Sequence, residues 1–329
     1  MPKIIRFHSI GGPENLKLED VPSRAPGEGE VKLRVQAVGL NRAEDLFMRG
    51  FYNEIPELPS RIGYEAAGVV EAVGPGVDSS WIGKQVATIP GFSMSKNGVL
   101  GEEAIVPEGS LGEYPAKLSP VEAAAIWMQY LTAYGALVMF GGLKRGDFVL
   151  ITAASSSVGL AAIQIVKAEG AIPIAATRKS DKRAQLLALG APHVIATEEE
   201  DLIARVNEIT GGNGARLIFD PVGGPSLEKL VEAAAYEGIV FLYGLLSMQP
   251  TPFPVRPALR KGLTLRGYSL HEIRRDPQLL KASKQYVFDR VADGRFHPKI
   301  AKTFPLAQSK EAYEYLESNQ QVGKVVITV

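Results

Sequence analysis

The sequence contains no cysteine among its 329 residues. Disulfide bonds, thiolate nucleophiles and metal sites with thiolate ligands are therefore excluded. The four histidines lie far apart and show no HExxH-like spacing. The chain also lacks an excess of either charge, because 36 Lys and Arg residues balance 36 Asp and Glu residues. Without a basic field to attract phosphates, we expect no nucleic-acid partner.

Signals for export and for membrane insertion are also missing. The N-terminal segment MPKIIRFHSIGG has no cationic region followed by a long apolar stretch, which a secretory signal requires. We expect no membrane-spanning helix, because no charge-free run reaches the roughly 18 apolar residues needed. Apolar residues make up 46% of the chain and charged residues 22%, as in ordinary globular proteins. We therefore expect a cytoplasmic, soluble protein of two domains.

Short apolar runs and turn clusters fill the first 120 residues. Turn sequences such as GGPEN, APGEGE and VGPGVDSS separate the runs. Short strands with regularly spaced turn signals are typical of an all-β unit. The runs that we predict to be strands are Lys3–Phe7, Val31–Val38, Ala66–Val73, Gln85–Ile89 and Glu103–Val106.

The pattern changes near Ser119. The segment SPVEAAAIWMQYLTAYGALVMF is predicted to be one long helix, with Ser119 as N-cap, Pro120 in the first turn and Glu122 completing a capping box. Apolar strands then alternate with helices as far as about Lys261, ending with the helix PSLEKLVEAAAYEG and the strand IVFLYG. This alternation predicts an α/β fold with a doubly wound parallel sheet. Beyond it we predict one helix through Leu279–Val291 and a last strand, GKVVITV.

The strongest local signal lies where an apolar strand, Val149–Ala153, turns into a helix. Small residues in this turn let the backbone approach a pyrophosphate, and the helix N-terminus offers unpaired N–H groups. Gly159 stands where the third glycine of GxGxxG allows close helix–strand packing, although Ala and Ser replace the first two. The alternative is a plain turn with no ligand. The predicted cofactor-binding residues here are Ala154, Ser155, Ser156, Ser157, Val158 and Gly159.

The end of the next strand discriminates between the two nicotinamide cofactors. NAD-binding folds carry a carboxylate about 20 positions past the turn. Here Thr177 and Arg178 lie 18 and 19 positions after Gly159, and Lys182 and Arg183 follow. A guanidinium can hold a 2′-phosphate with two hydrogen bonds. We therefore predict NADPH rather than NADH, the alternative being a solvated cationic helix start.

Together these segments resemble the medium-chain dehydrogenase/reductase superfamily over essentially the whole chain. The matching segments are GxVxLRVxAVGLN at 29–41, GYEAAGVVEAVGPGV at 63–77, LTAYGAL at 131–137, GDFVLITAASSSVGLAAIQIVKAEGA, IFDPVGG and GKVVI. The resemblance implies a GroES-like β-rich catalytic domain of residues 1–120 and 266–329, and a Rossmann NADPH-binding domain of residues 121–265. It also implies a homodimer or higher homo-oligomer. Candidate contact segments are IVFLYG and LLSMQPTPFPV, which could instead be a capped edge.

The superfamily divides by its use of zinc. Its alcohol dehydrogenases carry a ligand cysteine after the VG of the first domain and a ligand histidine in a GHE motif. This chain has Asn41 and Tyr64 at those places, so a tetrahedral zinc site cannot be assembled. Asn41 in GLN is similar to the zinc-free quinone oxidoreductase branch, which includes zeta-crystallin-like proteins. The resemblance implies hydride transfer without a metal to a small electrophile, a quinone or an enone.

The resemblance also implies functional residues. Asn41, Tyr52 and Thr132 are the catalytic candidates: an amide donor, a phenol that could donate a proton, and a hydroxyl on the long helix. Their structural alternatives are a positioning amide, a cleft wall and a hydroxyl bonded to its own helix. Lys324 could meet a cofactor phosphate or close a local ion pair. The further cofactor contacts that the resemblance implies are Gly223, Tyr243, Gly244, Ser269 and Leu270.

Two departures from the branch leave the substrate open between quinones and enones. Gln129 and Leu46 stand where the branch often has a lysine and an aromatic residue. Two other functions also remain open. One is the NADPH-dependent reduction of ketones or aldehydes, and the other is a non-catalytic, crystallin-like protein that binds NADPH.

Overall fold

The computed structural model describes all 329 residues, and the chain divides into two compact units. Unit 1 comprises Met1–Met128, Tyr286–Ala292 and His297–Val329, and unit 2 comprises Gln129–Gln285 and Asp293–Phe296. The chain therefore returns to unit 1 about twenty residues later than the predicted boundary at residue 266. Residues 266–285 belong to unit 2, and they begin with the end of a short strand, Thr264–Gly267, which pairs with the sheet of unit 2.

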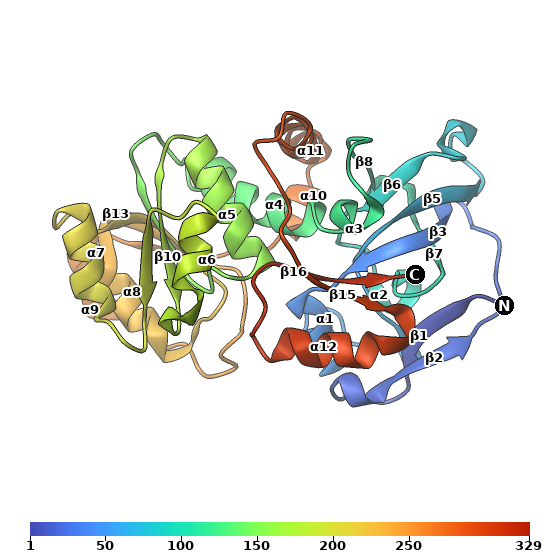
Figure 1. The fold of residues 1–329 in the computed structure, drawn as a ribbon, viewed down its shortest axis with the longest axis horizontal. Helices are drawn as coiled ribbons and strands as arrows, with labels where there is room; N and C mark the ends of the chain where they lie inside the picture. Colours follow the sequence, from blue (N-terminus) through green and yellow to red (C-terminus); the bar gives the residue numbers. More distant parts are fainter. The chain divides into compact units, whose positions relative to one another are not determined.

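Unit 1 is built on two sheets of mostly antiparallel strands (Figure 1). The larger sheet has the order β15 (Ile300–Pro305), β16 (Lys324–Thr328), β3 (Glu30–Gly39), β5 (Glu65–Val73), β6 (Gln85–Thr88) and β8 (Leu111–Glu113), with β7 (Glu103–Pro107) also paired to β3. The smaller sheet has the order β2 (Leu16–Asp20), β1 (Lys3–Phe7) and β4 (Ser60–Arg61). All five predicted runs are strands, because alternate side chains face the core, as Val31, Leu33 and Val35 do in β3.

One apolar core lies within unit 1, and short helices pack around it. Phe7 and Phe47 meet edge to face with ring centroids 5.8 Å apart. The helices are α1 (Arg42–Met48), α2 (Met94–Asn97), α3 (Pro120–Ala123) and α12 (Ser309–Glu317). Helix α12, which the sequence analysis did not predict, buries Tyr313 and Leu316 in this core.

Unit 2 has the predicted doubly wound sheet. Its six parallel strands have the order β11 (His193–Ala196), β10 (Ile172–Thr177), β9 (Phe148–Ile151), β12 (Ala215–Asp220), β13 (Ala234–Leu242) and β14 (Thr264–Gly267). In chain order this is 3-2-1-4-5-6, the Rossmann order, in which ligands bind outside the carboxyl ends of the strands where the order reverses. In this chain the reversal lies between β9 and β12.

Helices connect and cover these strands. They are α5 (Ser157–Ala168), α6 (Arg183–Ala188), α7 (Leu202–Thr210), α8 (Leu227–Ala233) and α9 (Val255–Lys261). Two more helices, α10 (His271–Arg274) and α11 (Pro277–Ala292), follow β14 in the chain, and residues Tyr286–Ala292 of α11 belong to unit 1. The predicted helix PSLEKLVEAAAYEG was too long at its C-terminal end. Residues from Ala234 onward join β13, which pairs with β12 on one side and β14 on the other.

The long apolar segment Pro120–Phe140 is not the single regular helix that was predicted. It comprises α3, a turn, α4 (Trp127–Tyr134) and a π-helical stretch, Gly135–Phe140. The predicted capping box at its start is present, with Ser119 and Glu122 bonding each other's backbone N–H groups. The segment is long and apolar enough to cross a membrane, which corrects the expectation that no such segment exists. However, 78% of its apolar window is buried inside the protein, as in a core helix.

Candidate functional site

The turn between β9 and α5 has the geometry that a phosphate-binding turn needs. A Cβ atom on Gly159 would lie 2.7 Å from the Cα and the carbonyl oxygen of Ala154, so only glycine fits. Ala153 has φ of 44°, in the left-handed region, where the chain reverses sharply. The Ser156 hydroxyl caps α5 by accepting the N–H of Gly159 at 3.1 Å. The predicted close packing of strand and helix is therefore present.

The first turn of α5 can receive an anion. The N–H groups of Ser157 and Val158 have no acceptor within the helix, and the helix dipole adds partial positive charge there. The ammonium of Lys182 lies 3.2 Å from the hydroxyl of Ser155 in the same turn. Burial lowers the pKa of Lys182, and the nearby guanidinium of Arg178 lowers this pKa further. Lys182 thus joins the predicted cationic cluster to the turn before α5.

The end of β10 carries the residues predicted to choose the cofactor. Thr177 is buried, and its carbonyl accepts the N–H of Thr197 at 2.8 Å. Arg178 is exposed, as a ligand for a phosphate must be. Arg183, by contrast, forms an ion pair with Glu200. Its contribution to the predicted cationic cluster is therefore largely neutralised.

The carboxyl ends of the next strands bring further predicted residues to the same edge of the sheet. Asp220, at the end of β12, is buried and accepts the N–H of Gly223 at 2.8 Å, which shapes the loop. Burial raises the pKa of this carboxyl group. Tyr243 stacks on Phe219 with ring centroids 3.9 Å apart, and its buried hydroxyl has no hydrogen-bond partner.

The remaining predicted cofactor residues of unit 2 follow β13 and β14. A Cβ on Gly244 would lie 2.7 Å from the carbonyl oxygen of Pro221, so glycine lets the two loops touch. Ser269 and Leu270 follow β14 and lead into α10, and Leu270 is buried. Thr132 is buried in α4 and belongs to unit 2. The structure therefore brings the turn between β9 and α5 and five further predicted residues to the carboxyl ends of one parallel sheet. These residues are Gly223, Tyr243, Gly244, Ser269 and Leu270.

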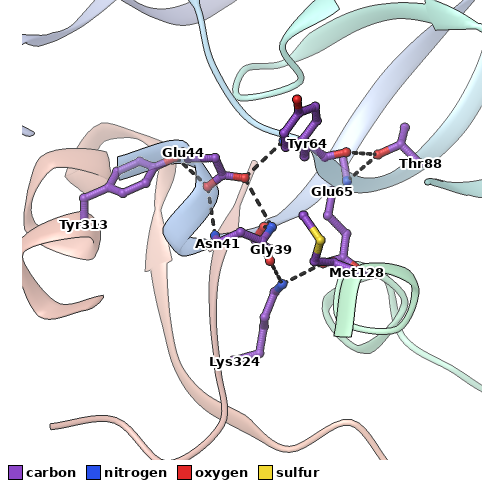
Figure 2. A network of polar contacts seen from close by, with 10 residues as sticks. Gly39, Asn41, Glu44, Tyr64, Glu65, Thr88, Met128, Tyr313 and Lys324 are labelled. Carbon is purple, nitrogen blue, oxygen red and sulfur yellow. Dashed lines mark hydrogen bonds and ion pairs between the residues drawn. The ribbon is translucent and has the colours of Figure 1, made fainter. Parts of the chain in front are cut away.

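Asn41 is enclosed in a polar network within unit 1 (Figure 2). Its amide nitrogen donates to the carbonyl of Gly39 at 3.0 Å and to Glu44 at 3.2 Å. Its amide oxygen accepts the ammonium of Lys324 at 2.7 Å. Because every polar atom of the side chain is occupied, Asn41 does not present the free amide donor that was predicted. The structure instead fits the alternative, a positioning amide that caps α1.

Lys324 was predicted to contact the cofactor, and the structure corrects this. Its side chain is fully buried, and its ammonium lies 2.6 Å from the carboxylate of Glu65. The other oxygen of Glu65 accepts the N–H of Met128 at 3.0 Å, near the start of α4. A Cβ on Gly39 would lie 2.6 Å from Cε of Lys324, so this glycine makes room for the lysine. The local ion pair is therefore the role that the structure supports.

The sequence analysis missed Glu44, which organises the network (Figure 2). This buried carboxylate accepts the N–H of Asn41 at 2.9 Å, the N–H of Tyr64 at 3.1 Å and the hydroxyl of Tyr313 at 2.8 Å. Burial raises the pKa of Glu44, while these donors favour its charged form. The spacing of Asn41 and Glu44 is that of a capping box, so a sequence signal existed. Nothing in the sequence indicated Tyr313.

Tyr52 and Tyr64 lie next to each other in unit 1. Their ring centroids are 6.1 Å apart with an interplanar angle of 62°. Tyr64 is buried, and Tyr52 is partly exposed. Around them no group of three or more His, Asp or Glu side chains could hold a metal ion. The cation beside Asn41 is the ammonium of Lys324.

A Rossmann sheet with a phosphate turn, joined to a GroES-like β-rich unit, defines the class of two-domain dehydrogenases and reductases. Residues 27–116 match the alcohol dehydrogenase GroES-like domain, and residues 157–285 match the zinc-binding dehydrogenase family. The chain is 31% identical to a 2-haloacrylate reductase of Burkholderia sp, over 98% of this chain and 97% of that protein. It is also 31% identical to a quinone oxidoreductase of Pseudomonas aeruginosa, over 99% of both chains.

Solved structures agree with these relatives. The quinone oxidoreductase of Escherichia coli, complexed with NADPH, superimposes with a TM-score of 0.92 at 30% identity, over 99% of this chain and 100% of that chain. The chain belongs to the zinc-free quinone oxidoreductase branch of the medium-chain dehydrogenase/reductase superfamily. It is therefore an oxidoreductase of this family, as its motifs predicted.

Proposed function

We propose that the protein is an NADPH-dependent reductase of small electrophiles, either quinones or activated carbon–carbon double bonds, and that it works without a metal. The observation that carries this proposal is the cationic pair at the phosphate turn. Lys182 contacts Ser155, and exposed Arg178 stands at the strand end where an NAD-binding fold has a carboxylate. The relative of known structure that binds NADPH supports the same cofactor.

The residues of unit 2 fit this cofactor. The absence of a Cβ at Gly159 lets α5 pack directly against the backbone at the end of β9, and the unpartnered buried hydroxyl of Tyr243 lies at the same sheet edge. In this assignment Ser157 and Val158 donate backbone N–H groups, and Arg178 and Lys182 neutralise phosphate charge. Bound NADPH supplies the hydride for the reduction.

The protein must also stabilise the negative charge that reduction places on the carbonyl oxygen of the substrate. The polar atoms of Asn41 are occupied by the network, so this amide serves as a support. The phenol of Tyr52 is partly exposed and titratable. We assign the donation of a proton to Tyr52.

An assay of NADPH oxidation with EDTA present tests this function. The panel should contain quinones, enones, haloacrylates, enoyl thioesters and simple ketones. We expect turnover of quinones or activated double bonds that EDTA does not change. Turnover of ketones alone would instead support a carbonyl reductase, and NADPH binding without any turnover would support a non-catalytic protein.

The homodimer is likewise a proposal. The contact surface proposed here differs in part from the one predicted from the sequence. Strand β13 is paired on both sides and cannot pair with a second copy. The outer edge of β14 is unpaired within the sheet, and the segment before α9 exposes Leu245, Met248 and Phe253. We propose that a second copy extends the sheet at β14 and covers these side chains. The molar mass in solution, from light scattering during size-exclusion chromatography, tests this assignment.

A further inference from the structure

Three consecutive glutamates, Glu198–Glu200, follow β11 and have no role in the function proposed above. They lie beside the segment that follows β10, because the parallel pairing of β10 and β11 continues past the ends of both strands. Beyond the last paired strand residues, the carbonyl of Arg178 accepts the N–H of Glu198 at 2.9 Å. The acidic run therefore borders residues 178–183, the cationic loop that carries Arg178 and Lys182.

The other two glutamates hold the cationic loop through their carboxylates. Glu199 accepts the N–H of Ser180 at 3.0 Å. This bond lowers the pKa of Glu199, so the carboxylate is charged at neutral pH. Glu200 forms an ion pair with Arg183, and it also accepts the N–H of Ala196 at 2.7 Å, at the end of β11. Successive residues of the acidic run thus contact the loop at positions 178, 180 and 183.

These contacts decide which cation of the loop stays available. Arg183 is occupied by its ion pair with Glu200. The ammonium of Lys182 lies 3.2 Å from the hydroxyl of Ser155, in the turn before α5. Arg178 is exposed, and its guanidinium forms no ion pair or hydrogen bond within the chain. An unpaired guanidinium on an anchored stretch of backbone is well suited to bind a phosphate with two hydrogen bonds.

We propose that Glu199 is a positioning residue that strengthens the preference for NADPH over NADH. It does so by holding the backbone of Ser180, midway between Arg178 and Lys182. This inference rests on the proposed function. A loop that is ordered before the ligand arrives loses less conformational entropy on binding. Only a cofactor with a 2′-phosphate gains from this order, because the 2′-phosphate is the group assigned to the loop. The Glu199 carboxylate also repels that phosphate, but solvent weakens the repulsion between exposed charges.

The test compares Glu199→Ala, which removes the anchor, with Glu199→Gln, which keeps an oxygen that can accept the N–H of Ser180. Glu198→Ala is the matched control, because it removes a neighbouring exposed carboxylate that makes no contact with the loop. Isothermal titration calorimetry on the full chain gives the Kd for NADPH, for NADH and for adenosine 2′,5′-bisphosphate. Glu199→Ala should raise the Kd for NADPH and for the bisphosphate by about tenfold and leave the Kd for NADH unchanged. Glu199→Gln and Glu198→Ala should stay within about twofold of the unmodified protein.

A double-mutant cycle separates the hydrogen bond from the charge. Ser180→Pro removes the N–H that Glu199 accepts, and the extended backbone of Lys179 allows a proline to follow it. Glu199→Ala should have no further effect on the Kd for NADPH when Ser180→Pro is present. The same loss in both backgrounds would overturn the proposal, because the carboxylate would then act without its bond to Ser180.

The remaining outcomes are equally decisive. Equal changes in the Kd for NADPH and NADH would mean that Glu199 only supports the fold, and tighter binding of NADPH by Glu199→Ala would mean that repulsion dominates. Either result overturns this inference, as does a Glu199→Gln protein that binds NADPH as weakly as Glu199→Ala. If the unmodified protein prefers NADPH and Glu199→Ala keeps that preference, this inference fails while the proposed function stands. If the unmodified protein binds neither NADPH nor the bisphosphate, the proposed function fails as well.

Discussion

The buried ion pair between Lys324 and Glu65 allows a quantitative prediction. Both side chains are completely buried, and the ammonium and carboxylate are 2.6 Å apart. Lys324→Met removes the cation, keeps much of the volume and leaves the Glu65 carboxylate in the core. Breaking a buried pair in this way costs about 3–5 kcal/mol. Loss of the hydrogen bond to Asn41 adds about 1 kcal/mol. We therefore expect the free energy of unfolding of unit 1 to fall by about 4–6 kcal/mol.

The chain provides its own probe for this measurement. Both of its tryptophans, Trp81 and Trp127, lie in unit 1. Tryptophan fluorescence during urea denaturation therefore follows the unit that contains the ion pair. The double variant Lys324→Met with Glu65→Gln should recover most of the loss, because no buried charge then remains unpaired.

Two results would refute this reasoning. A loss below about 1 kcal/mol for Lys324→Met would mean that the pair behaves like a surface salt bridge. A double variant as unstable as the sum of its single variants would mean that the two charges are not coupled. A folded Lys324→Met protein should bind NADPH with unchanged affinity, because the proposed phosphate contacts lie in unit 2. A large rise in the Kd for NADPH without loss of stability would favour the phosphate role instead.

Three further predictions concern unit 2. Arg178→Ala should raise the Kd for NADPH by about 10- to 100-fold and change the Kd for NADH little; equal effects in isothermal titration calorimetry would contradict the assignment to the 2′-phosphate. Burial lowers the pKa of Lys182, and only its charged form attracts phosphate. The Kd for NADPH should therefore rise as pH increases through that lowered pKa, and Lys182→Arg should flatten this dependence because arginine keeps its charge; identical pH profiles would exclude Lys182. Gly159→Ala places a Cβ 2.7 Å from backbone atoms of Ala154, so we expect a lower Tm and weaker NADPH binding in thermal-shift measurements; an unchanged Tm would show that the turn relaxes freely.

Local sequence patterns were enough to predict much of the fold and of the candidate cofactor site. The alternation of apolar strands with helices was enough to predict the parallel sheet, because period and order along the chain are local properties. The need for glycine at position 159 also followed from its place between a strand and a helix. The motifs placed Arg178 and Lys182 beside the turn, and the structure shows Lys182 in contact with Ser155.

The network around Asn41 could not be derived in this way. It joins Asn41 to Lys324 and Glu44 to Tyr313, pairs separated by 283 and 269 positions in the chain. No periodicity or motif reports which distant side chain will neutralise a buried charge, since that depends on how strands β3, β5 and β16 pair. The same holds for the Tyr52–Tyr64 contact. The chain's local patterns thus established where a dinucleotide could bind in unit 2, whereas long-range packing determined which polar groups of unit 1 are occupied by partners within the protein.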